Sequence, residues 1–305
     1  MNKKMLYVIT GILVMLAAWY FFVKDYDYQI TFKSKNPKGF VYNNIKTWNN
    51  NRPVKDTMVK TISSIPFSEI QQKYYPAKDS TINIKWELDK INDSLTKIIG
   101  YFKSDHGGPL LRTQLLFSTP DFVKQSLDFA KGLNRRIKSR SKLYKLSDVD
   151  TIMVPSKQYV YVLCDATLQT KAKSMIANNG YVLQYLRKNN LELTDFPFVD
   201  IQSWNKQTDS IRFKFCFPIK TAHQSQESDI KFDERPQYKA LRIRFNGNYS
   251  KSHMAWYAFN DYFEANHSTE QQILPTEIFL DDPNQGGEDI QWRADIVLPL
   301  NQIDK

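Results

Sequence analysis

The stretch LPTEIFLDDPNQGGEDIQWRADIVLPL, residues 274–300, decides the fold of the second half of the chain. Residues 277–280 alternate as a β-strand and stop at the following Asp-Asp-Pro, because proline cannot donate to a sheet ladder. The Gly-Gly pair at 286–287 supplies a turn, and residues 292–298 alternate again as a second strand. Asp295 lies in the middle of that strand, where a carboxylate is unusual. It is therefore the first candidate for a functional residue.

The same pattern occurs earlier in the chain, displaced by about 80 residues. The segment IRFKFCFPI, residues 211–219, shares with residues 294–300 the alternation and the Pro-apolar ending. Three more features match in the same order: a proline before a strand (Pro155 and Pro236), an apolar residue before a proline (Phe196-Pro197 and Leu274-Pro275), and a helical stretch (171–189 and 250–266). We infer a tandem duplication of a β-α-β-β unit.

Three segments of the second repeat resemble the GyrI-like effector-binding domains: RIRFNGNY at 242–249, EIFLDDP at 277–283 and DIVLPL at 295–300. The resemblance covers residues 150–301, about half the chain. It implies a curved antiparallel sheet with helices on one face and a ligand cleft on the other. It also implies an acidic cleft residue that engages cationic or polar aromatic ligands. Glu277 matches the family's Glu-x-aromatic position, and Asp295 stands where a glutamate is common.

Strand alternation predicts one apolar face of this sheet and one face of aromatic and charged residues. A solvated face and a ligand cleft both fit that pattern, and the duplication favours the cleft. Symmetry places Lys214 opposite Asp295, so an ion pair between them that seals the cleft is a further possibility. The candidate ligand-binding residues on the polar face are Tyr159, Tyr161, Lys214, Arg242, Arg244, Glu277, Phe279 and Asp295.

These residues favour binding of a small amphipathic or aromatic molecule over catalysis, because no second residue is committed to positioning water or relaying a proton. Some GyrI-like proteins hydrolyse strained small molecules. The resemblance therefore makes a hydrolase the alternative, with Glu277 as its general base. The four histidines have no metal-ligand spacing, so neither a metal nor a cofactor is predicted. An enzymatic activity stays open.

The amino terminus carries an uncharged apolar run at residues 6–23, which as a helix spans about 27 Å, close to the bilayer core. Two lysines precede the run, and a Trp-Tyr pair suits the membrane interface. We predict a retained single-pass anchor over residues 1–24. A cleavable signal peptide is the alternative, because Ala17-Ala18 are small. The charge rule places the soluble part outside the cytoplasm.

Residues 25–146 have the order strand, short helix, antiparallel strands and long helix, which resembles the SRPBCC helix-grip domains. The expected strands are 28–33, 59–65, 82–88, 95–103 and 112–118, with a hairpin turn at Asn92-Asp93. A helix begins near Val41, and a long one begins at Pro120. Trp86, Tyr101 and Phe102 either line a pocket or fill the core, and a filled core is the commoner case. The chain is thus expected to be α+β, with residues 147–305 as the GyrI-like domain.

Charge and cysteine usage add two expectations. The chain has 305 residues and a formal net charge of +10, and its 42% hydrophobic content is ordinary for a globular protein. Seven cations without an intervening acid lie between residues 131 and 145, and five of them share a helical face. Anionic lipid headgroups suit this run better than nucleic acid, because no DNA- or RNA-binding motif accompanies it. Cys164 and Cys216 are expected on opposite faces of the sheet and unbridged.

Overall fold

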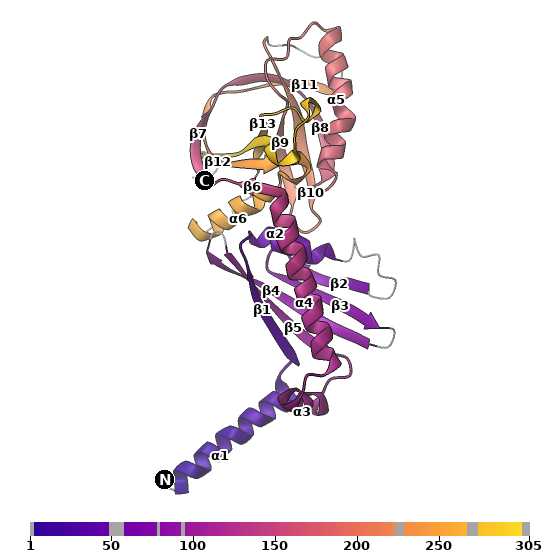
Figure 1. Ribbon diagram of the computed structural model, residues 1–305. Helices are drawn as coiled ribbons and strands as arrows, with labels where there is room; N and C mark the ends of the chain where they lie inside the picture. The colour runs from indigo at the N-terminus through magenta and orange to yellow at the C-terminus, as the bar shows by residue number, and fades with distance from the viewer. Residues whose placement is uncertain are drawn as a thin grey trace. The chain divides into compact units, whose positions relative to one another are not determined.

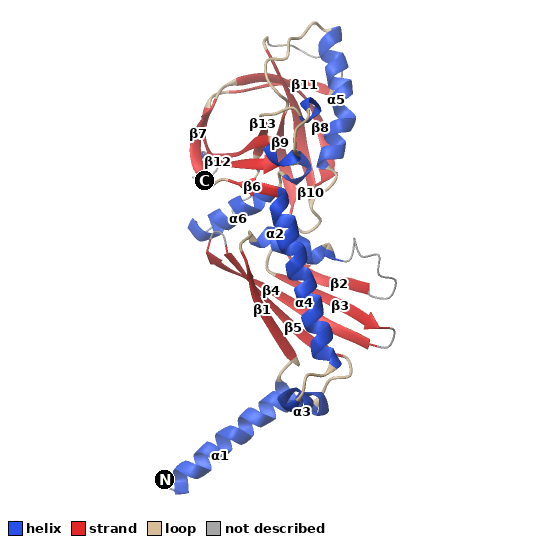
Figure 2. Cartoon of the chain, viewed as in Figure 1, coloured by secondary structure: helices blue, strands red, loops and turns tan. Residues whose placement is uncertain are grey.

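The computed structural model describes residues 3–48, 58–77, 80–92, 95–221, 223, 229–266 and 274–300. The chain forms two compact units, Met1–Lys138 and Ser139–Lys305, with the helices and antiparallel sheets of an α+β protein (Figures 1 and 2). The α+β class predicted from the sequence is confirmed. Asp93 of the predicted turn lies outside the described residues, but the strands on either side of it pair as a hairpin.

The first unit begins with helix α1 (Lys3–Ala18), which continues as a π-helical turn, η1 (Trp19–Val23). Within Lys3–Val23, an 18-residue window has a mean hydropathy of 2.2, and none of that window is buried. In the described part of the chain this is the one helix long and apolar enough to cross a membrane. A signal sequence has the same properties.

A five-stranded antiparallel sheet follows, in the order β1-β5-β4-β3-β2. Its strands match the prediction, with β3 as an addition and one exception. The expected strand at 112–118 is wrong, because residues 112–117 belong to helix α3, which starts with Pro109 after Gly108 and ends before Ser118. The elements are β1 (Tyr28–Ser34), α2 (Lys38–Lys46), β2 (Met58–Ile65), β3 (Glu69–Ala77), β4 (Ser80–Asn92), β5 (Leu95–Ser104), α3 (Pro109–Phe117) and α4 (Asp121–Arg140).

Helix α4 packs against one face of this sheet and fills the core. Its Phe129 stacks on Trp86 at 6.3 Å between ring centroids, and the Trp86 indole donates to Gln72 at 3.1 Å. Trp86 and Phe102 have no exposed surface, whereas Tyr101 lies on the other face of the sheet. The predicted filled core is therefore confirmed for Trp86 and Phe102.

The second unit contains a sheet in the order β11-β8-β10-β9-β13-β14-β12-β6, and β7 also pairs with β12. The central part, β8-β10-β9-β13-β14-β12, is symmetric. Exchanging β8 with β12, β9 with β13 and β10 with β14 gives the same order read from the other end, as a duplication requires. The strands are β6 (Tyr144–Leu146), β7 (Asp150–Val154), β8 (Lys157–Thr167), β9 (Phe198–Asn205), β10 (Ser210–Ile219), β11 (Ile230–Arg235), β12 (Tyr238–Gly247), β13 (Thr276–Phe279) and β14 (Arg293–Pro299).

Both helices of the second unit pack on the same face of its sheet. Asn178 of α5 (Lys171–Lys188) contacts Cys164 of β8, and Trp256 of α6 (Met254–Asn266) packs on Trp204 of β9. Cys164 and Trp204 lie on one face by strand register, because they stand opposite Phe213 and Ile211 of β10. We call this the helix-covered face and the other the open face.

The structure tests two further expectations, one about the cysteines and one about the basic run. Cys216 pairs with Tyr161 and faces away from Cys164, and both thiols are free, as predicted. The basic helical face is only partly formed. Helix α4 ends at Arg140, so Lys142 lies in the following turn and Lys145 in β6.

Candidate functional site

The register of β13 and β14 separates the two acids that the sequence placed on one face. Glu277 stands opposite Ile296, whereas Ile278 stands opposite Asp295. Residues directly opposite each other in an antiparallel pair point to the same side. Glu277 and Phe279 therefore lie on the helix-covered face and Asp295 on the open face, and the predicted common face is wrong for these two residues.

Glu277 is held in a buried ion pair under the helices. Lys171, the first residue of α5, places its Nζ 2.5 Å from both carboxylate oxygens, and the Ser252 hydroxyl donates to Oε1 at 3.0 Å. Lys171 and Glu277 have no exposed surface. Burial lowers the pKa of Lys171, while Glu277 opposes that shift. A general-base role for Glu277 would require this sealed pair to open.

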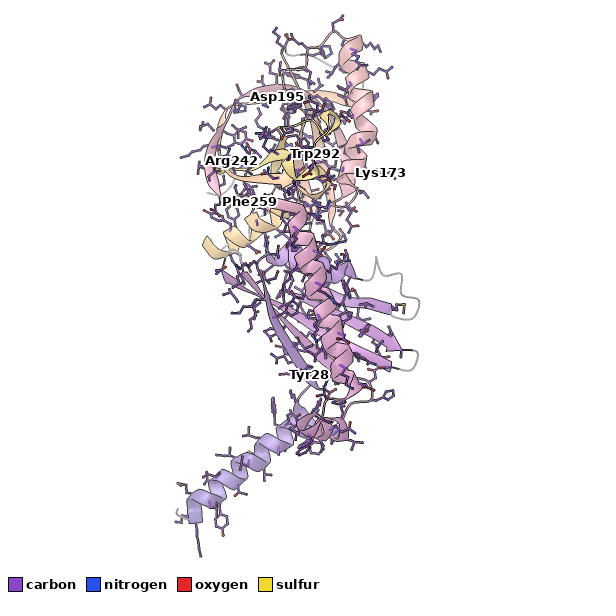
Figure 3. The ribbon with its side chains drawn as sticks, viewed as in Figure 1. Tyr28, Lys173, Asp195, Arg242, Phe259 and Trp292 are labelled. Atoms are coloured by element: carbon purple, nitrogen blue, oxygen red, sulfur yellow. The ribbon has the colours of Figure 1, made fainter. Side chains whose placement is uncertain are left out.

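On the open face, the register aligns a row of polar side chains across the sheet. Lys214 of β10 pairs with Asp200 of β9, which pairs in turn with Thr276 of β13. The row continues through Val297 to Arg242 of β12, which Figure 3 labels. We call this row the polar row; four of its five residues are polar, and the fifth, Val297, is buried and apolar. Two of the predicted site residues, Lys214 and Arg242, belong to it.

Arg235, the last residue of β11, binds two neighbouring residues of the polar row, Asp200 and Thr276. Its Nη2 lies 2.6 Å from Oδ1 of Asp200, and its Nη1 donates to the Thr276 hydroxyl at 2.9 Å and the Tyr238 hydroxyl at 3.2 Å. Burial opposes the charge, but Asp200 outweighs it and raises the pKa of Arg235 above its ordinary value. The guanidinium is thus a fixed cation paired with a carboxylate.

A pocket of about 370 Å³ adjoins this cluster, and we call it the Arg235 pocket. Its lining combines polar and charged side chains with apolar ones. Its lining consists of Asp200, Ile201, Gln202, Arg235, Pro236, Tyr238, Leu274, Thr276 and Pro299.

The remaining predicted residues of the first repeat lie beside the polar row. Lys214 donates to Asp233 at 2.7 Å, and the buried Tyr159 hydroxyl donates to the same oxygen at 3.2 Å. The Lys214 ammonium also lies 4.6 Å from the Tyr161 ring centroid, within cation–π range. Burial raises the pKa of Tyr159.

In the second repeat, Asp295 forms ion pairs with two arginines. Arg244 donates to it with Nε at 2.5 Å and Nη2 at 3.1 Å, and Arg242 lies 3.6 Å away. Arg242 also donates to Asp150 of β7, which lowers the pKa of that carboxyl group. The possible Lys214–Asp295 pair is therefore replaced by other ion pairs, Lys214 with Asp233 and Asp295 with Arg244.

Sequence reasoning missed the residues that line the pocket. Asp200 carries the same signal as Asp295, a carboxylate inside an apolar strand. Thr276 comes directly before the strand that the alternation predicts at residues 277–280. Arg235 lies at a strand end before Pro236, and nothing in the sequence brings it to the middle of another strand pair.

No family model matches the sequence, and no curated protein matches it. Solved structures give similarities at low identity. The C-terminal domain of EcmrR gives a TM-score of 0.41 at 19% identity, over 52% of this chain and 97% of that chain. EcmrR in its cryo-EM complex with DNA gives 0.42 at 17% identity, over 62% and 75%. An uncharacterized conserved protein from Listeria innocua gives 0.34 at 14%, over 50% and 91%. Similarity at this level does not carry a function to this chain.

Proposed function

We propose that the chain is a membrane-tethered protein that binds a small amphipathic molecule in the Arg235 pocket of its second unit. In this proposal the second unit is a GyrI-like effector-binding domain, residues 25–146 form an SRPBCC-like helix-grip domain, and residues 6–23 span the bilayer. The supporting observation is the partly buried Arg235–Asp200 pair at the wall of a pocket with apolar surfaces. A polar anchor beside apolar walls fits a ligand with a polar head and an apolar body.

The charges at the pocket specify the ligand further. Arg235 and Asp200 neutralise each other, so a ligand with a net charge gains little there and must still lose its hydration. A neutral or zwitterionic head can accept a hydrogen bond from Arg235 and form another with the Thr276 hydroxyl. Leu274 and Pro299 offer apolar contacts to the rest of the molecule.

The residues predicted from the sequence take two roles in this proposal. Six of them lie on the open face, in the polar row or beside it, and do not line the pocket: Tyr159, Tyr161, Lys214, Arg242, Arg244 and Asp295. Glu277 and Phe279 instead hold the helices on the sheet from the opposite side. Phe279 packs on Tyr249 with ring centroids 4.6 Å apart.

A direct test starts with native mass spectrometry of the full chain in detergent, which detects a retained small molecule. Binding of neutral Nile red, cationic rhodamine 6G and anionic anilinonaphthalene sulfonate is then compared by fluorescence. We expect the neutral probe to bind most tightly. Thr276→Val keeps the side-chain shape and removes the hydroxyl that joins Arg235 to Asp200, so binding should weaken by about 1–3 kcal/mol.

The matched control is Thr151→Val, the same change at an exposed position of β7. It should leave probe binding unaltered. Equal effects of the two substitutions, or no retained molecule together with no probe binding, would contradict the Arg235 pocket as the binding site.

A further inference from the structure

Helix α3 has the reverse of the polarity expected for a helix in water. Its charged residue, Arg112, is 6% exposed, while Leu110, Leu116 and Phe117 are 76%, 58% and 84% exposed. A surface helix of a globular protein turns its apolar side inward and its charges outward. Contiguous exposed apolar side chains mark contact with a partner or a membrane.

Arg112 ties α3 to the end of the apolar helix. Its Nη1 donates to the carbonyl of Tyr20 at 2.7 Å and its Nη2 to the carbonyl of Lys24 at 2.5 Å. Its Nε donates to the buried Asp27 carboxylate at 3.0 Å. Carbonyls at a helix end lack partners within the helix, so this guanidinium satisfies groups that would otherwise be unpaired. The contact fixes α3 beside η1.

The length of the apolar helix determines where α3 would lie relative to the bilayer. The uncharged run at residues 6–23 has 18 residues, which at 1.5 Å per residue span about 27 Å, close to the thickness of a bilayer core. If α1 spans the membrane, its end at η1 lies where the acyl chains meet the headgroups. Phe22 and Val23 are 76% and 64% exposed, so apolar surface continues from η1 to α3.

We propose that α3 is an interfacial helix whose Leu110, Leu116 and Phe117 insert into the boundary between headgroups and acyl chains of the bilayer that α1 spans. This inference rests on the membrane tether of the proposed function. The occupant is lipid because the exposed side chains continue the apolar surface of the span itself. Arg112 and Asp27 then hold the first unit at a fixed height above the membrane.

The test uses the full chain with one added cysteine at a time, labelled with the fluorophore NBD. Phe117→Cys reports on α3, Val14→Cys on the middle of α1, and Lys131→Cys on an exposed site of α4. Unsubstituted chain gives the background, since Cys164 and Cys216 are buried. The proteins are reconstituted in phosphatidylcholine–phosphatidylglycerol vesicles that carry a spin-labelled lipid, either shallow or deep.

We expect the shallow label to quench position 117 severalfold more than position 131, and the deep label to quench position 14 most. Quenching at 14 without quenching at 117 would overturn the interfacial role and leave the tether standing. Absence of quenching at 14 would remove the tether and the inference together. A blue shift at 117 without quenching, lost on dilution, would assign the surface to a second copy of the chain. Leu116→Cys provides a second reading of α3 if Phe117→Cys does not fold.

Discussion

At the scale of single residues, the Lys171–Glu277 pair lies under both helices of the second unit and joins α5 to β13. A buried pair contributes little net stability, because desolvation offsets the attraction, but removing one partner leaves an uncompensated charge. The Ser252 hydroxyl accepts from Lys171 at 2.7 Å and cannot replace a carboxylate. The pair therefore constrains which substitutions the unit tolerates.

We predict that Glu277→Leu alone destabilises the second unit by about 3–5 kcal/mol. The double substitution Lys171→Met with Glu277→Leu should recover most of that loss, because both charges are gone and the volume is kept. Urea midpoints, followed by hydrogen exchange in β13 and β14, measure both changes. A double variant as unstable as the single one would show that the pair has a further role.

His253 gives the second unit a pH dependence. Its side chain is buried, and burial, reinforced by Lys171 and Lys251, lowers its pKa from 6.5 to about 3. The unfolded chain therefore takes up a proton below about pH 6.5 that the folded chain refuses. This contribution to stability is full above that pH and falls toward pH 3, by at most about 1.4 kcal/mol per pH unit.

We expect His253→Leu to lose less stability than the unsubstituted chain when the pH falls from about 7 to about 4.5. Urea denaturation at the two pH values measures the difference. Phe259→Leu is the control, because it changes a buried side chain of α6 that carries no titratable group and should leave the pH dependence unaltered. Identical acid sensitivity in all three proteins would contradict a neutral buried His253.

At the scale of elements, the absence of a side chain at Gly100 of β5 gives space to Trp86 of β4, which stands directly opposite. A Cβ on Gly100 would lie 2.6 Å from the indole and 2.8 Å from the Phe102 ring. Both rings are fully buried and cannot move aside without disturbing the core.

Gly100→Ala should accordingly destabilise the first unit by about 1–3 kcal/mol, the usual cost of overpacking. Gly180→Ala is the matched change in α5, where no atom lies within 4 Å of the new Cβ. There, alanine should stabilise the helix by up to about 1 kcal/mol. Thermal unfolding of each unit, read by hydrogen exchange, separates the two effects. A stable Gly100→Ala variant would mean that the Trp86 contact is looser than described.

The sequence predicted most of these elements because alternation, proline stops and helical spacing are local signals. It predicted the duplication because the same local signals recur in order. It did not predict which residues share a face across strands, since that depends on register, and a single-residue slip reverses every side chain. Glu277 shows this: its own strand alternates as expected, but the connection to β14 sets its partner as Ile296.

Helix α3 and the Arg235 pocket were missed for other reasons. The segment around Arg112 was predicted as a strand, whereas its apolar residues lie on a short helix whose leucines and phenylalanine are exposed. The Arg235 pocket depends on contacts between strands far apart in sequence, such as Arg235 with Asp200 and Thr276. Local patterns do not contain that information, although Asp200 could have been noticed by its position in an apolar strand.

At the scale of the whole molecule, the proposed membrane tether and the proposed amphipathic ligand support each other. An amphipathic ligand concentrates at the bilayer surface, where its apolar body leaves water. A binder tethered there meets a higher local concentration than one free in solution. This advantage requires only that α1 is retained, and it holds on either side of the membrane.

The charges that flank α1 predict a side of the membrane for the two units. Lys3 and Lys4 precede the span, and the positive-inside rule then favours an amino terminus in the cytoplasm with both units outside. Lys173→Cys, at an exposed position of α5 labelled in Figure 3, should therefore react with a membrane-impermeant maleimide in intact bacterial cells. Buried Cys164 and Cys216 keep the unsubstituted control unlabelled.

Three outcomes separate the possible topologies. Labelling of a membrane-bound protein in intact cells supports the tethered, extracytoplasmic arrangement. Labelling only after permeabilisation would place both units in the cytoplasm, and the four lysines at positions 24, 33, 35 and 38 would then outweigh the two before the span. A labelled chain in the soluble fraction, shortened at its amino terminus, would identify α1 as a cleaved signal peptide. In that case α3 would lose its bilayer, and its exposed leucines would need another partner.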